Sequence, residues 1–124
     1  MDLKHFPVYA NVAVSDLDRS RTWYEERLGL VPDEKTPGGF WYQFADDTWL
    51  HVYKSGTAGS AKNTVAGFTV ENIEKVMEDL RSRGLEFEDY DEPKTEDGLA
   101  TFESNKSAWF RDPDGNIYEL SETL

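Results

Sequence analysis

The chain has 124 residues, the size of one compact domain. Its 25 acidic residues outnumber its 13 basic ones, and the formal net charge of −12 argues against sequence-independent nucleic-acid binding and against docking on anionic membranes. Cysteine is absent, which excludes disulfides and thiolate chemistry. No apolar run reaches the roughly 20 residues of a membrane span, and we expect a cytoplasmic protein.

The first half of the chain predicts a strand, a helix and three further strands. Alternation over residues 8–14 places Tyr9 and Asn11 on one face of the first strand. A Ser-x-x-Asp capping pattern at Ser15 predicts the start of the helix, and Gly29 is a suitable residue to end it. The expected elements are a strand at 8–14, a helix at 15–28, and strands at 30–34, 40–45 and 49–53.

The second half repeats this order after a short polar segment. Asn72 is a candidate helix cap and Gly84 a candidate helix end, and they align with Asp16 and, within one residue, Gly29. Chance similarity of two strand–helix segments is the alternative, but the recurrence of all five elements favours an internal duplication. The expected organisation is a single domain over 1–124, with module one at about 1–54, a linker at 55–63 and module two at 64–124. The expected elements of module two are a strand at 65–70, a helix at 72–84, and three strand-like regions at 85–90, around 99–102 and 108–111, and at 117–120.

Three stretches resemble the vicinal oxygen chelate superfamily, which includes glyoxalase I, bleomycin-resistance proteins, fosfomycin-resistance enzymes and extradiol dioxygenases. They are residues 12–20, the Trp23-Tyr24 pair with the following Leu28-Gly-Leu30, and Phe110-Arg-Asp-Pro-Asp-Gly-Asn-Ile-Tyr-Glu-Leu120. The resemblance implies an α+β fold of two tandem βαβββ modules that form a cupped, barrel-like mixed sheet with the helices outside. It also implies a homodimer in which modules of two chains complete a cleft.

In metal-dependent members of this superfamily, four strand positions supply His and Glu ligands. These positions correspond here to Tyr9, His51, Val65 and Glu119. Only His51 and Glu119 are good ligands, because a phenol is protonated at neutral pH and valine cannot ligate. We therefore expect no cofactor. A divalent metal (zinc, nickel, iron or manganese) held by His51 and Glu119 is the alternative.

The cleft positions are rich in aromatic residues. The expected ligand-binding residues are Tyr9, Asn11, Trp49, His51, Tyr53, Trp109 and Glu119, with Val65, Thr69 and Ile117 as further lining. Aromatic faces beside carboxylates favour planar or cationic organic ligands. His51 is interpreted as a histidine hydrogen-bonded to a carboxylate, or together with Glu119 as a catalytic acid/base pair. Alternation leaves the face of Trp41 undecided.

The leading hypothesis is a binding protein that sequesters an aromatic or cationic small molecule in an acidic, aromatic-lined cleft without a full metal site. The competing hypothesis is a metal-dependent glyoxalase-like lyase or isomerase, or a dioxygenase, using His51 and Glu119. A protein-interaction module that uses open sheet edges is a third possibility, without dedicated support in the sequence.

Overall fold

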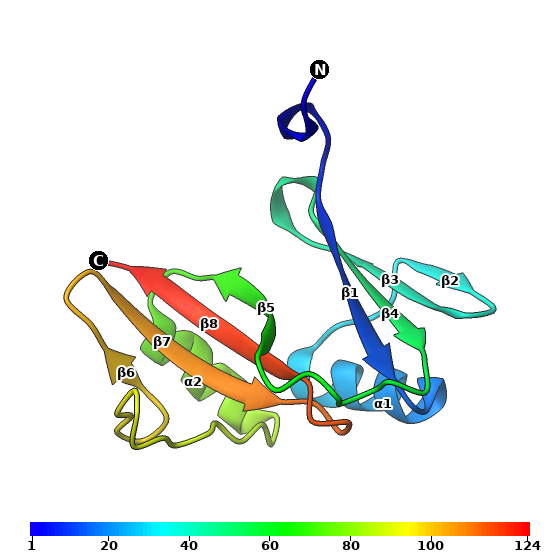
Figure 1. Cartoon of the computed structure of the whole chain (residues 1–124). Coiled ribbons are helices and arrows are strands. Elements are labelled where there is room, and N and C mark those ends of the chain that lie inside the picture. Colours follow the sequence, from blue (N-terminus) through cyan, green and yellow to red (C-terminus); the bar gives the residue numbers. More distant parts are fainter.

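The computed structural model describes the whole chain, residues 1–124. It is an α+β fold of two α-helices and two mixed four-stranded sheets, which stay open instead of closing into a barrel (Figure 1). The elements of the first half are η1 (Leu3–His5), β1 (Tyr9–Val14), α1 (Leu17–Leu28), β2 (Glu34–Thr36), β3 (Gly39–Gln43), η2 (Ala45–Asp47) and β4 (Trp49–Lys54). Those of the second half are β5 (Thr64–Thr69), α2 (Ile73–Ser82), β6 (Ala100–Thr101), β7 (Asn105–Arg111) and β8 (Ile117–Thr123).

The two halves have the same topology. Sheet A runs in the order β1-β4-β3-β2, and sheet B in the corresponding order β5-β8-β7-β6. In each sheet the first strand pairs in parallel with the last, and the other pairs are antiparallel. The strand–helix–strand–strand–strand order is the one that the sequence predicts for both modules, but in module two β6 and β7 both come from the region expected around 99–102 and 108–111, and no strand forms at 85–90.

The helix boundaries follow from local capping. Asp16, and not Ser15, caps α1, since its side chain accepts a hydrogen bond from the backbone N–H of Arg19. The Ser15 hydroxyl instead donates to Asp114 in the other module, 2.6 Å away. Gly29 ends α1 with φ +71°, as expected, and Asn72 caps α2.

Two expected strands differ in the structure. Residues 85–90 form no regular strand, because they run beside β7 with one backbone bond, from Glu88 N–H to the Trp109 carbonyl at 2.8 Å. Residues 30–33 cross from α1 to the edge of sheet A, so β2 begins only at Glu34.

One hydrophobic core joins the two modules. Val12 and Val52 of sheet A are fully buried on the same side as Tyr24 of α1. Tyr24 contacts Tyr118 of sheet B edge to face, with ring centroids 6.2 Å apart. Phe44 and Phe68 make a second aromatic contact between the modules at 5.4 Å. The opposite side of each sheet is therefore left without a helix against it.

Figure 1 shows that the sheets diverge from the end of the molecule where β1 finishes and β5 begins, and that the residues before β1 extend beyond sheet A. Neither helix is long and apolar enough to cross a membrane.

Candidate ligand-binding site

Five aromatic side chains lie together on the side of sheet A that faces away from α1. Trp41 and His51 stack with ring centroids 4.2 Å apart and planes at 16°, and Tyr53 continues the stack from His51 at 5.6 Å and 15°. Tyr9 and Trp49 stand steeply to Trp41, at 62° and 78°. We call these five residues the aromatic surface.

Strand register builds this surface. The antiparallel pairing of β3 and β4 sets Trp41 opposite His51, and the parallel pairing of β1 and β4 sets Tyr9 opposite Trp49. Residues that face each other across neighbouring strands point to the same side of the sheet. A sheet with one side packed against the core and the other solvated therefore presents these rings to solvent.

His51 is held as a neutral ring within the surface. Its Nδ1 lies 2.9 Å from the Asn11 amide oxygen, to which it donates. The partner is thus an amide, whereas the sequence predicts a carboxylate. Partial burial lowers the pKa of His51 below its usual 6.5, so the ring is uncharged at pH 7. Gly39 leaves room for it, since a Cβ there would sit 3.0 Å from His51 Nε2.

A groove of about 620 Å³ runs between the two modules beside the aromatic surface. Its walls come from the start of β1, the connection between β3 and β4, and β5, and ten of its fourteen lining residues are hydrophobic. Tyr9 and Trp49 belong both to the aromatic surface and to this groove. The groove is large enough for a drug-sized organic molecule.

The open side of sheet B carries the other expected ligand-binding residues. Trp109 of β7 and Gly67 of β5 both pair with Glu119 of β8. The absence of a side chain at Gly67 leaves space beside the carboxylate, because an added Cβ would lie 3.7 Å from Glu119 Oε1. Trp109 also contacts Tyr90 edge to face at 5.6 Å.

The structure thus divides the expected site residues into two groups. Tyr9, Asn11, Trp49, His51 and Tyr53 lie together on sheet A, and Trp109 and Glu119 lie on sheet B. Neither His51 nor Glu119 lines the groove between the modules, although Thr69 does. Val65 sits at a bulge in β5 and packs against the core.

A resident divalent metal does not fit the side chains of this chain. Catalytic zinc sites usually take three protein ligands. Nowhere in the structure do three or more His, Cys, Asp or Glu side chains gather in a way that could hold a metal ion. His51 also has its Nδ1 occupied by Asn11. His51 and Glu119, which lie on different sheets, therefore do not form a metal centre within one chain.

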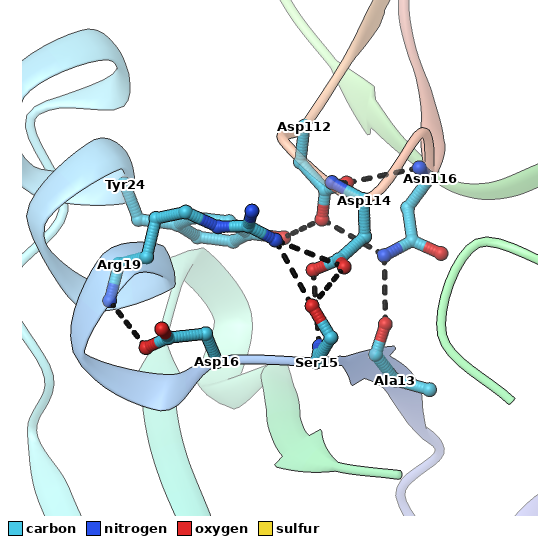
Figure 2. Close-up of polar contacts among 8 residues, drawn as sticks. All are labelled: Ala13, Ser15, Asp16, Arg19, Tyr24, Asp112, Asp114 and Asn116. Carbon is cyan, nitrogen blue, oxygen red and sulfur yellow. Dashed lines mark hydrogen bonds and ion pairs between the residues drawn. The ribbon is translucent and has the colours of Figure 1, made fainter. Parts of the chain in front are cut away.

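The Asp112–Asn116 turn between β7 and β8 fastens module two to module one. Asp114 accepts hydrogen bonds from the Ser15 hydroxyl and from the Arg19 guanidinium, at 2.6 and 3.0 Å. The Asn116 amide donates to the Ala13 carbonyl at the end of β1, at 2.8 Å. Figure 2 shows these contacts converging from α1, β1 and the turn. We call this set of contacts the clasp.

The clasp has a buried centre. Asp112 is 4% exposed, and its carboxylate accepts hydrogen bonds from the backbone N–H groups of Asp114 and Asn116 and from the Tyr24 hydroxyl. Burial and the nearby charge of Asp112 raise the pKa values of Tyr24 and Tyr118, so both phenols are neutral. The sequence indicates a tight turn here, and the structure adds that it joins the modules.

Three further residues join the site. Trp41 belongs to the aromatic surface. Glu34 and Asp47 lie beside Trp41 and Trp49, at one end of the aromatic surface. The face of Trp41 follows from its pairing with His51, a register that alternation within one strand does not fix. No sequence signal identifies Asp47, which reaches the surface because Asp46 and Asp47 both adopt φ +57°.

The fold and the clasp together define a protein of two βαβββ modules with exposed sheet surfaces and a groove between the modules. The family model described as Glyoxalase/Bleomycin resistance protein/Dioxygenase superfamily matches residues 6–120. The chain belongs to this superfamily.

Solved structures show the same fold over almost the whole chain. A glyoxalase/bleomycin resistance protein/dioxygenase from Alicyclobacillus acidocaldarius is 19% identical, with a TM-score of 0.70 and 100% of this chain and 96% of that chain covered. TnmS3, an antibiotic binding protein from a Streptomyces species, is 25% identical, with a TM-score of 0.69 and 96% of each chain covered. The fosfomycin resistance protein FosX from Listeria monocytogenes is 13% identical, with a TM-score of 0.69 and 96% and 93% covered. Comparison with curated proteins found no match.

Proposed function

We propose that this protein binds an aromatic or cationic small organic molecule and sequesters it without a resident metal. The observation that carries the proposal is the aromatic surface of sheet A, with the apolar groove beside it. Partly exposed rings that lie close to one another attract planar molecules through dispersion and cations through the negative faces of the rings.

The electrostatics favour a cation over an anion. The chain carries a formal net charge of −12, and the neutral His51 adds no positive charge to the aromatic surface. An acidic protein raises the local concentration of cationic ligands, and salt weakens this effect.

The similarity to TnmS3, which is described as antibiotic binding, supports a binding role for this chain. That protein and this one share a fold over 96% of both chains at 25% identity. The comparison supports the class of function and leaves the ligand to be found by experiment.

We further propose a cytoplasmic homodimer with two equivalent clefts. In each cleft, the open side of sheet A in one protomer faces the open side of sheet B in its partner. Glu119 and Trp109 of one chain then complete the site formed by His51, Asn11 and Tyr53 of the other. The sides of both sheets that face the helices are buried in the hydrophobic core of a single chain, so only the open sides are available to form a cleft between two chains.

The test is a calorimetric titration with proflavine, a planar aromatic cation, and with anthracene-2-carboxylate, a planar anion of similar size. We expect saturable binding of proflavine that weakens as salt is raised and falls at least tenfold in Trp49→Ala. Trp23→Phe on α1 is the control and should bind like the parent protein. A proflavine affinity that changes neither with salt nor in Trp49→Ala would overturn the proposal.

A further inference from the structure

A small hollow lies at the end of the aromatic surface where Tyr9, Trp41 and Trp49 meet. Its volume is about 270 Å³, and its remaining walls come from Pro7, Val8, Glu34 and Asp47. No lysine or arginine lines it. We call the three rings and the two carboxylates of this hollow the aromatic cage, and we infer that the cage binds the alkylated ammonium group of an organic cation. The inference rests on the proposed function and names the chemical group that this part of the site selects.

The rings are arranged as walls around a volume. Tyr9 meets Trp41 at 5.0 Å and 62°, and Trp49 meets Trp41 at 6.3 Å and 78°. Two rings that stand steeply to a third offer a cation ring surfaces in more than one direction, which one flat stack cannot do. This geometry suits the rounded, weakly hydrated surface of a methylated ammonium group.

The cage is organised before any ligand arrives. His51 stacks on Trp41 at 4.2 Å and fixes that wall. The Trp49 indole N–H donates to Asp47 Oδ1 at 3.2 Å, and the Gln43 side-chain amide donates to the same oxygen at 2.8 Å. Both the second wall and its neighbouring carboxylate are therefore held in place, so little ordering is left to oppose binding.

Two carboxylates provide the counter-charge. Glu34 pairs with Trp41 across β2 and β3, and Asp47 lies just before β4. A quaternary ammonium has no N–H group to donate, so rings and nearby negative charge are the means by which a protein recognises it. Tyr9 and Trp49 also line the large groove, so the remainder of the ligand can extend there from the cage.

The experiment compares choline with 3,3-dimethylbutan-1-ol, which has the same shape and no charge. Calorimetry at low salt should give at least tenfold tighter binding of choline. Equal affinities for the two compounds, or no binding of choline, would refute the cage.

Two variants locate the binding. Trp41→Leu should weaken choline binding at least tenfold, and Glu34→Gln should weaken it about threefold, because one ring wall or one counter-charge is lost. Glu103→Gln, which removes an exposed carboxylate from the other module, is the matched control and should leave the affinity unchanged. If Glu34→Gln and Glu103→Gln reduce the affinity equally, the cage assignment is wrong and only the overall charge matters.

The same samples separate this inference from the proposed function. If proflavine binds in a Trp49-dependent way and choline does not, the cage inference fails and the binding function stands. If neither compound binds, both fail. Circular dichroism checks that each variant is folded, and Glu34→Gln, on a short exposed strand, keeps the test open should Trp41→Leu unfold.

Discussion

His51 shows how far one residue can be interpreted from sequence. Alternation within one strand places it on the same face as Trp49 and Tyr53, and the structure agrees. Its actual partners, Asn11 and Trp41, come from two other strands. Their identity depends on register between strands, which no pattern within a single segment determines.

The lowered pKa of His51 predicts a pH effect on cation binding. Below its pKa, and thus below pH 6.5, the ring becomes positive next to Trp41 and repels a cation in the cage. The affinity for choline, whose charge does not titrate, should therefore fall between pH 7 and pH 5 in the parent protein and stay nearly constant in His51→Gln. Calorimetry over this range checks the prediction, and identical pH profiles would contradict it.

The same shift affects stability with a definite sign. The unfolded chain binds a proton at His51 more readily than the folded chain does, because burial lowers the pKa in the folded state. Stability should therefore decline as the pH falls below 6.5.

At the scale of elements, capping and turn signals predict where α1 and α2 end, and the duplication predicts the order of strands. The role of the Asp112–Asn116 turn as a clasp could not be predicted, because its partners Ser15, Arg19 and Ala13 lie about a hundred residues away. Long-range contacts of this kind depend on how the two modules pack.

Two buried tyrosines provide a matched test of the clasp. The Tyr24 hydroxyl donates to Asp112 at 2.8 Å, whereas the Tyr42 hydroxyl is buried without a partner and burial raises its pKa to about 12. Tyr24→Phe should lower the free energy of unfolding by about 1–3 kcal/mol. Tyr42→Phe should leave it unchanged or raise it by up to about 1 kcal/mol, since no hydrogen bond is lost. Urea unfolding measures both, and equal destabilisation would show that the Tyr24 contact contributes nothing specific.

At the scale of the whole molecule, the fold class and the superfamily are already evident in the sequence, because the duplicated order of elements and the motif ending at Leu120 span nearly the entire chain. How the open side of sheet A is placed relative to the open side of sheet B is not evident in the sequence. Within one chain His51 and Glu119 lie on different sheets, and the large groove between the modules is lined by neither of them.

The proposed homodimer predicts complementation between inactive chains. Trp41→Leu damages the side of the cleft on sheet A, and Trp109→Leu damages the side on sheet B. When the two variants are unfolded, mixed and refolded together, binding should be recovered, because each heterodimer contains one cleft with both sides intact. Isothermal titration should find up to one site per heterodimer, whereas a site built within a single chain would recover none.

The most direct test uses the four tryptophan side chains as reporters of where a ligand binds. Trp41 and Trp49 lie on sheet A, Trp109 on sheet B and Trp23 on α1. Titration with proflavine, followed by the indole N–H signals in a ¹H–¹⁵N spectrum, should shift the signals of Trp41 and Trp49 saturably and with one affinity, while the Trp23 signal stays in place. Unchanged Trp41 and Trp49 signals, with proflavine bound elsewhere or not at all, would contradict the assignment of sheet A as the binding surface.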